Sequence, residues 1–198
     1  MKIVLIDYGA GNVQSVLFAL ERLGVHASLS ANAAEIATAD KVIFPGVGEA
    51  SSAMQALRAQ GLDALIPQLK QPVLGICLGM QLLCRHSEEG DTAALGVFDV
   101  EVKRFVPQPA DAFQKVPHMG WNTLDVMRGP LFDGLPALAS VYFVHSFYAA
   151  RCSDTSAETS YNMPFSAALC RDNFYAVQFH PEKSGATGER ILQNFIQR

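Results

Sequence analysis

The amino-acid sequence predicts an α/β fold, with a mainly parallel central sheet that is flanked by helices and extended by antiparallel strands. Two observations support this class. In the first half, short β-branched runs alternate with amphipathic stretches, the pattern of βα units around a parallel sheet. From about Gly96, strand-like segments follow one another, separated by Pro, Gly, Asn or Asp. We expect a single domain over residues 1–198, a length that can bury a substantial core.

The first half should supply three parallel strands, at Ile3–Ile6, Lys41–Phe44 and Val73–Ile76. Each is followed by a Gly-containing turn and then by a helical segment, at about Asn12–Leu23, Ser51–Gln60 and Leu78–Arg85. The carboxyl ends of such strands share one edge of the sheet, where ligands bind in open α/β folds. The turns at Pro45–Gly48 and Gly75–Gly79 are therefore placed for chemistry.

The second half should add antiparallel strands, at Val97–Phe105, Trp121–Val126, Val141–Tyr148, Ser166–Arg171 and Phe174–Phe179. A closing helix is expected at about Gly188–Gln197. It would place four apolar side chains on one face for docking on the core: Ile191, Leu192, Phe195 and Ile196.

Composition narrows the range of partners. Hydrophobic residues make up 49% and charged residues 17%, which is typical of a globular chain, and the net charge of −4 provides no basic field for nucleic acid. No apolar run approaches the ~18 residues needed to cross a bilayer, so we expect a cytoplasmic protein. The four cysteines form no CxxC pair and are expected to be reduced.

Cys77 is the first candidate catalytic residue. It lies where a buried strand runs into a helix, with Gly75 and Gly79 on either side, in the form of a nucleophile elbow. The helix that begins at Leu78 points its N-terminus at Cys77 and favours the thiolate, and the Leu78 amide is aimed at an oxyanion. The alternative is a small buried hydrophobe, the usual role of a free cysteine and the one we assign to Cys84.

His180 and Glu182 form the second candidate pair. Pro181 keeps His180 out of the helical region, and residues i and i+2 of an extended chain project to the same side, so Glu182 can reach the His180 ring. A base oriented by a carboxylate, close to a thiol, is the arrangement that activates a cysteine nucleophile.

Two rival interpretations of these motifs are weaker. No second ligand lies at a usual metal spacing from the Cys, His or Glu, so no metal is expected. The segment Gly9–Asn12 lacks the third glycine of a dinucleotide fingerprint, and no Gly-Lys-Ser/Thr follows a glycine loop. We therefore expect no nucleotide and no other cofactor.

Three segments together closely resemble the class I (triad) glutamine amidotransferases: Pro45–Gly48, Gly75–Gln81 and Gln178–Glu182. Four others look like the glutaminase subunit of imidazole glycerol phosphate synthase, from histidine biosynthesis: Asp7–Asn12, Pro117–Asn122, Phe143–Ser146 and His180–Gly185. The resemblance covers the whole chain and implies a flavodoxin-like, class I glutamine amidotransferase-like fold.

The resemblance also implies roles for individual residues. Cys77 would attack the side-chain amide of glutamine, while His180, oriented by Glu182, protonates the departing ammonia and leaves a γ-glutamyl thioester. The oxyanion would be held by the backbone N–H groups of Leu78 and Val47, the latter eased into place by Gly46 and Gly48. Glutamine itself would be gripped by Gly48, Gln81, Ser146 and Phe147. The family usually has Tyr at the position of Phe147.

The resemblance further implies a partner. Ammonia would pass to a separate (βα)₈-barrel synthase subunit, which makes imidazole glycerol phosphate and an aminoimidazole ribonucleotide, in a heterodimer whose interface includes Asn12, Trp121 and Lys183. Two alternatives remain open at this stage. The chain could serve another acceptor, in anthranilate, aminodeoxychorismate or pyridoxal phosphate synthesis, or it could be a non-catalytic scaffold subunit.

Overall fold

An eight-stranded sheet forms the centre of the part of the chain that the computed structural model describes, residues 1–9, 13–106 and 115–198. Its order is β2-β1-β3-β4-β14-β13-β12-β9. The strands from β2 to β14 are parallel, with bounds Ala27–Ser30, Ile3–Ile6, Lys41–Gly46, Val73–Cys77 and Phe174–Val177. The remaining three are antiparallel, with bounds Met163–Arg171, Thr155–Tyr161 and Val126–Met127. The expected mainly parallel sheet with antiparallel additions is confirmed.

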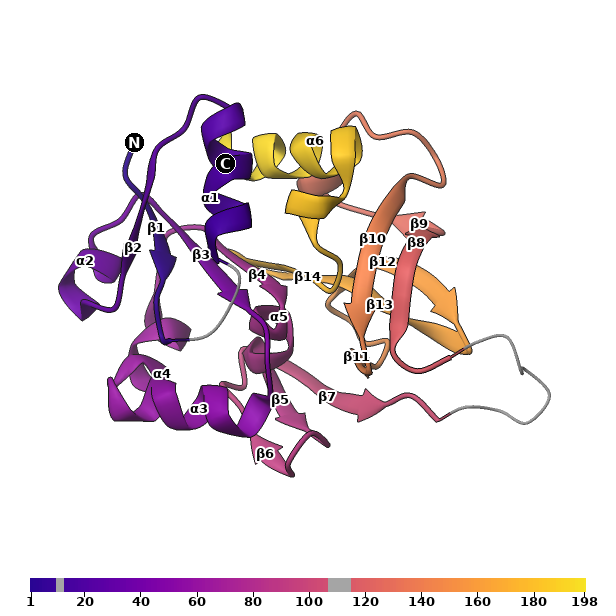
Figure 1. The fold of residues 1–198 in the computed structure, drawn as a ribbon, viewed down its shortest axis with the longest axis horizontal. Helices are drawn as coiled ribbons and strands as arrows, with labels where there is room; N and C mark the ends of the chain where they lie inside the picture. Colours follow the sequence, from indigo (N-terminus) through magenta and orange to yellow (C-terminus); the bar gives the residue numbers. More distant parts are fainter. Residues whose placement is uncertain (10–12, 107–114) are drawn as a thin grey trace.

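Helices cover both faces of the parallel strands (Figure 1). Ile3 and Leu5 of β1 pack into the same core cluster as residues of α1 (Val13–Arg22) and α6 (Gly185–Ile196). Val4 and Ile6 alternate to the other face, which is covered by α2, α3, α4, the 3₁₀ helix η1 and α5, with bounds Ala33–Ala37, Ala50–Ala59, Leu62–Leu65, Ile66–Gln68 and Leu78–Leu83. Among the described residues, no helix is long and apolar enough to span a membrane.

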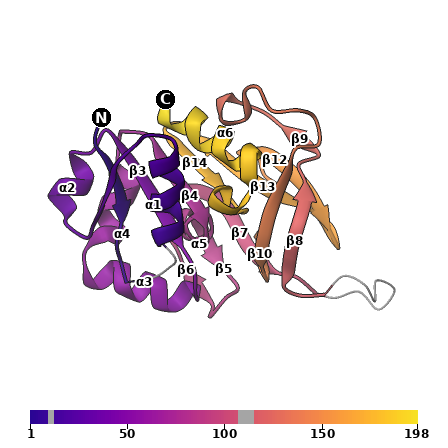
Figure 2. The same cartoon turned by 45° about the horizontal axis from the view of Figure 1, so that its top comes forward.

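Two smaller sheets complete the described structure. Strands β8 (His118–Thr123) and β10 (Ser140–His145) form an antiparallel pair that stands beside the main sheet in Figure 2. The other sheet has the order β11-β7-β5-β6, with bounds Phe147–Ala149, Phe98–Arg104, Cys84–Ser87 and Thr92–Ala93. Two 3₁₀ helices, η2 and η3, span Pro130–Phe132 and Pro181–Lys183.

Three of the differences between the structure and the sequence prediction concern how predicted elements end or pair. β14 is antiparallel to β13 but parallel to β4, because the hairpin turns the chain back alongside the parallel strands. The helix expected to reach Arg85 ends at Leu83, where the chain enters β5 and Cys84 pairs with Phe98. The strand expected over 141–148 is interrupted at Ser146, so that β10 joins β8 whereas β11 joins β7.

Candidate active site

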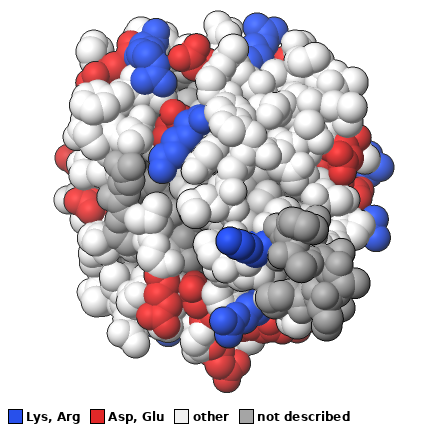
Figure 3. Space-filling model, turned by 45° about the vertical axis from the view of Figure 1, so that its right-hand side comes forward, with Lys and Arg blue, Asp and Glu red and all other residues white. Residues whose placement is uncertain are grey.

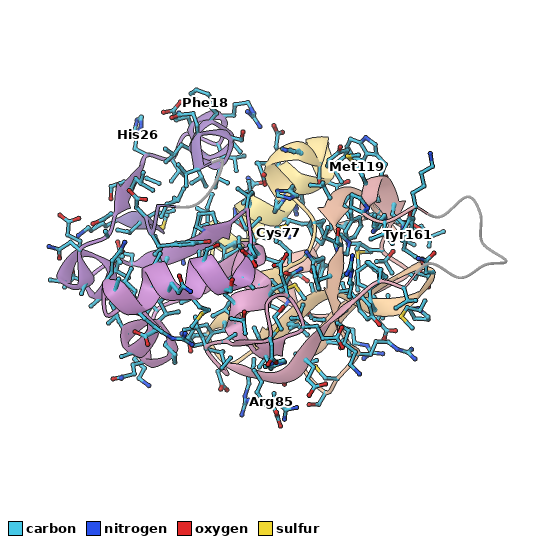
Figure 4. The ribbon with its side chains drawn as sticks, turned by 60° about the horizontal axis from the view of Figure 1, so that its bottom comes forward. Phe18, His26, Cys77, Arg85, Met119 and Tyr161 are labelled. Atoms are coloured by element: carbon cyan, nitrogen blue, oxygen red, sulfur yellow. The ribbon has the colours of Figure 1, made fainter. Side chains whose placement is uncertain are left out.

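Cys77 is the last residue of β4 and directly precedes α5. Its backbone has φ 53° and ψ −109°, a conformation that strains a residue with a Cβ. Figure 4 shows Cys77 near the centre of the molecule. The side chain is 7% exposed, so its sulfur is reached through a cavity rather than from the open surface. The elbow that the sequence predicts is present in the structure.

Close backbone packing fixes this elbow. A Cβ added to Gly79 would lie 1.9 Å from the carbonyl oxygen of Phe44, so only glycine lets α5 begin against β3. A Cβ on Gly75 would lie 3.0 Å from the Met80 amide nitrogen. Across the sheet, Cys77 is in register with Gly46 at the end of β3. The nucleophile candidate and the expected oxyanion strand therefore form one tightly packed unit.

His180 and Glu182 are both buried and are hydrogen-bonded to each other, with 2.8 Å between Nδ1 and Oε1. His180 is extended, but Glu182 lies in the 3₁₀ helix η3 rather than in the extended chain that the spacing predicts. The His180 backbone is held by strand β10, because its N–H donates to the Tyr142 carbonyl at 2.9 Å. Ser184 Oγ donates to the His180 carbonyl at 2.7 Å.

The His180 ring carries a proton more readily than an ordinary histidine. Burial opposes the charged ring, but hydrogen bonding and negative charge at Cys77 and Glu182 outweigh it and raise the pKa to about 10. The two contacts differ in geometry. The Glu182 bond is short, whereas His180 Nε2 has no partner of normal hydrogen-bond geometry among the residues that the structure describes. We therefore attribute the Cys77 contribution mainly to the nearness of the sulfur. A protonated His180 places an imidazolium beside the sulfur.

A cavity of about 360 Å³ brings the predicted residues together. Its lining includes Cys77, His180 and six residues predicted for the oxyanion hole, substrate site or interface: Val47, Gly48, Leu78, Gln81, Ser146 and Phe147. Lys183, predicted for the interface, also lines it. Gly46 lies outside this lining, in a small neighbouring space shared with Val47, His180 and Glu182.

The side-chain nitrogen of Gln81 is already engaged. Nε2 donates to the Phe147 carbonyl at 2.9 Å and to Gln178 Oε1 at 2.9 Å. An amide nitrogen carries two hydrogens, so both are used. A ligand in the cavity can contact the Gln81 side chain through Oε1. The Phe147 carbonyl is also engaged, because it accepts from Gln81 Nε2 and lies 2.7 Å from His145 Nδ1.

Four residues at the site were given no role from the sequence, although three of them lie in segments that carry the resemblance. Glu89, Pro117 and His145 line the cavity, and Gln178 donates from Nε2 to Cys77 Sγ at 3.8 Å. Glu89 had no local signal, since it reaches the site from the β5–β6 turn. Gln178 opens the motif that contains His180 and Glu182, and its position next to a buried strand end was the available signal.

The interface candidates have different settings. Trp121 on β8 is 58% exposed, and Met119, two residues earlier on the same strand, is 64% exposed. The Trp121 ring contacts Tyr142 edge-on, with centroids 5.9 Å apart. Acidic and basic residues are interspersed on the face in Figure 3, without a large area of one sign. Asn12 lies outside the described residues.

The described residues do not group as metal ligands. In the ranges 1–9, 13–106 and 115–198, no set of three or more His, Cys, Asp or Glu side chains could hold a metal ion. The chemistry available at the cavity is that of a cysteine sulfur, an imidazole ring and a carboxylate in sequence, with backbone N–H groups at the start of α5.

Comparison with known proteins decides the family. The model of the class I glutamine amidotransferases matches residues 4–198. The chain belongs to this family. Among curated relatives, the imidazole glycerol phosphate synthase subunit HisH of Bacteroides thetaiotaomicron is 60% identical over 196 residues, covering 99% of each chain. The protein of the same name from Yersinia pseudotuberculosis is 45% identical, covering 100% of both chains.

Solved structures support the fold of this class I glutamine amidotransferase. A structure of a glutamine amidotransferase has a TM-score of 0.74 at 20% identity and covers 98% of this chain and 97% of its own. The structure of PurLQS from Thermotoga maritima contains a chain with a TM-score of 0.71 at 15% identity, where the match covers 99% of this chain and 97% of that one. At such identities the likeness shows the fold alone.

Proposed function

We propose that this chain is the glutaminase subunit of imidazole glycerol phosphate synthase and hydrolyses L-glutamine to L-glutamate and ammonia. The observation that carries the proposal is the buried His180–Glu182 hydrogen bond of 2.8 Å beside Cys77, in a cavity large enough for an amino acid. Relatives 45–60% identical over almost their whole length, which are named as subunits of that synthase, supply the biological context.

In the proposed mechanism the Cys77 thiolate attacks the side-chain amide carbon of glutamine. The negative oxygen of the tetrahedral intermediate accepts hydrogen bonds from the backbone N–H groups of Leu78 and Val47. The His180 imidazolium, whose proton is favoured by its raised pKa, protonates the leaving nitrogen and ammonia departs. The products of this half-reaction are a γ-glutamyl thioester on Cys77 and a neutral His180.

The second half-reaction uses the same groups in reverse. Neutral His180 removes a proton from water, the resulting hydroxide attacks the thioester carbonyl, and the carbon–sulfur bond breaks to give glutamate and the Cys77 thiolate. Glu182 keeps Nδ1 protonated throughout, so that Nε2 is the nitrogen that exchanges protons.

The rest of the cavity is assigned to the amino-acid end of glutamine. Gly48, Gln81, Ser146 and Phe147 form this wall, with Gly46 allowing the Val47 peptide to turn. We add Glu89, because its carboxylate lines the cavity and has the charge that the α-ammonium group of glutamine requires. Burial raises the pKa of Glu89, so a bound ammonium group would also favour its charged form.

The proposed partner is a separate (βα)₈-barrel synthase subunit that receives the ammonia in a cytoplasmic heterodimer. Residues 1–198 would act as one glutamine amidotransferase domain without a cofactor. Trp121 and Lys183, together with Asn12, are proposed to contact this partner. Met119 and Trp121 are exposed on β8, which supports the choice of Trp121. Lys183 is exposed and lines the cavity, which supports a path for ammonia from the cavity to the interface.

The test is glutamine hydrolysis by the free chain and by its copurified complex, for wild type and for Cys77→Ser. We expect Cys77→Ser to lose at least about 10³-fold in kcat, as nucleophile replacements in triad enzymes do, with an unchanged circular dichroism spectrum. Wild type should gain at least about tenfold in the complex. Substantial hydrolysis by Cys77→Ser, or a free chain as fast as the complex, would contradict the corresponding part of the proposal.

A further inference from the structure

A continuous chain of buried hydrogen bonds leads from strand β8 towards the nucleophile candidate. His118 and His145 face each other in register on β8 and β10, and His118 Nδ1 lies 3.0 Å from His145 Nε2. His145 Nδ1 lies 2.7 Å from the Phe147 carbonyl. That carbonyl also accepts from Gln81, so one backbone oxygen joins the histidine pair to the side chains of α5.

The chain continues from Gln81 to the sulfur. Gln81 Nε2 donates to Gln178 Oε1 at 2.9 Å, and Gln178 Nε2 donates to Cys77 Sγ at 3.8 Å. Gln178 is completely buried, and Gln81 is 5% exposed. A buried amide without partners is costly, so these bonds fix the orientation of both side chains.

The direction of every bond follows from the Phe147 carbonyl. A carbonyl oxygen only accepts, so Gln81 must present its nitrogen to it, and the second hydrogen of that nitrogen must meet an oxygen of Gln178. Gln178 is thereby turned with its nitrogen towards Cys77. By the same argument His145 donates from Nδ1 and accepts at Nε2 from His118. Reversing the Gln178 amide would set its nitrogen against the nitrogen of Gln81.

We propose that Gln178 is a further catalytic residue, which stabilises the Cys77 thiolate through an N–H···S hydrogen bond, and that Gln81 positions it. The inference rests on the proposed function and deepens it. Another polar neighbour of the sulfur, the Val144 carbonyl at 3.9 Å, can accept only from the protonated thiol. The Val144 contact therefore favours the protonated thiol, whereas the Gln178 N–H favours the thiolate.

Other groups around the sulfur also act on its charge. His180, backed by Glu182, lies beside it. Burial raises the pKa of the Tyr8 hydroxyl, and the nearby Cys77 raises it further. His145, Glu89 and Lys183 line the same cavity. A test of Gln178 must therefore leave these groups in place and measure the ionisation of the sulfur directly.

The experiment measures the rate at which iodoacetamide alkylates Cys77 in the full chain, by peptide mass spectrometry, between about pH 4 and pH 10. Gln178→Met has a similar length but lacks the N–H donor. Its alkylation profile should move up by about one pH unit and glutamine hydrolysis should fall about tenfold, the effect of losing a hydrogen bond to a charged group. Gln178→Glu keeps an acceptor for Gln81 but places a carboxylate next to the sulfur. Because a negative charge there opposes ionisation of the thiol, its alkylation profile should move to higher pH by more than that of Gln178→Met.

Asn194→Leu is the matched control. Asn194 is also a buried amide, and it donates to the Leu131 and Asp133 carbonyls at 3.0 and 2.9 Å, away from the cavity. This variant should lose stability but keep the wild-type alkylation profile. Wild-type profiles in the Gln178 variants would overturn the proposal, and Gln178→Glu decides alone if Gln178→Met does not fold. Failure of the proposed function would appear separately, as a wild-type chain that does not hydrolyse glutamine with or without its copurified partner.

Discussion

Cys77 is held by close backbone packing in the parallel part of the main sheet, whereas His180 is held by hydrogen bonds from the separate β8–β10 pair and from Ser184, which precedes α6. On the cysteine side, Gly79 lets the start of α5 touch the backbone of β3. On the histidine side, Tyr142 and Ser184 hold the His180 backbone. A buried histidine pair adjoins the cavity, which one of its two members lines. The packing around Cys77 should therefore be sensitive to any added side-chain volume. The hydrogen bonds on the histidine side should be sensitive to protonation of the buried histidines.

This difference suits the two roles that we propose. A strained nucleophile requires a frame that cannot relax, and close-packed backbone supplies one without any titrating group. A base that exchanges protons requires a defined tautomer, which directional hydrogen bonds provide. A substitution on each side can therefore test the two arrangements separately.

The largest effect on stability is expected from Gly79→Ala on the cysteine side. The new Cβ would lie 1.9 Å from the Phe44 oxygen and 2.9 Å from the Phe44 carbon, so strand or helix must shift. We expect a loss of more than about 4 kcal/mol in the free energy of unfolding, or no folded protein at all. Urea denaturation followed by circular dichroism measures this directly.

Gly24→Ala is the control for the same chemical change. Gly24 has φ +73° but open space around its Cβ position, so only backbone strain of about 1 kcal/mol is expected. Equal urea midpoints for the two variants would show that the approach of α5 to β3 is not a tight constraint.

A smaller effect is expected on the histidine side, when pH falls. Burial lowers the pKa of His118 to about 4. Burial also lowers the pKa of His145 to about 3, although its hydrogen bond to the Phe147 carbonyl acts in the opposite direction. Each folded-state value lies below the unfolded value of about 6.5, so the unfolded chain binds protons first and stability is lost as pH falls below that value. For His118 alone this amounts to about 2 kcal/mol between pH 7 and pH 5.

His118→Phe should remove this part of the acid sensitivity. Phenylalanine keeps the stacking on Tyr161 and Phe143, at 3.9 and 4.7 Å between centroids, but cannot be protonated. The variant should be less stable than wild type at pH 7. Between pH 7 and pH 5, however, its free energy of unfolding should fall by about 2 kcal/mol less than that of wild type. The exposed His26, changed to Gln, should leave the wild-type slope unaltered. A His118→Phe slope equal to that of wild type would contradict the buried-pair explanation.

Local sequence patterns were sufficient to predict the strands and the elbow on the cysteine side. The strands at Ile3, Lys41 and Val73 begin as predicted, and the flanking glycines of Cys77 identified the elbow. These features depend on residues close together in the sequence. The end of α5 was misjudged because Leu82, Leu83 and Cys84 suit a helix as well as a buried strand, and only pairing with Phe98 decides between them.

The histidine side could be predicted only in part. The His180–Glu182 spacing was visible, but the contact of Gln178 with Cys77 joins residues 101 positions apart, and the His118–His145 pair depends on the register of β8 with β10. Such contacts have no local signal. The roles of Val47, Gln81 and Ser146 stay predictions, although the cavity brings these residues together.

The central claim, that Cys77 is a nucleophile which acts on glutamine, is tested most directly by labelling with a glutamine analogue that carries an electrophile at its side-chain end. Mass spectrometry of the labelled peptides separates the four cysteines. Burial raises the pKa of the Cys84 and Cys170 thiols, which favours their unreactive form. We predict labelling at Cys77 alone, abolished by excess glutamine. Equal labelling of two or more cysteines, or none at Cys77, would contradict the account.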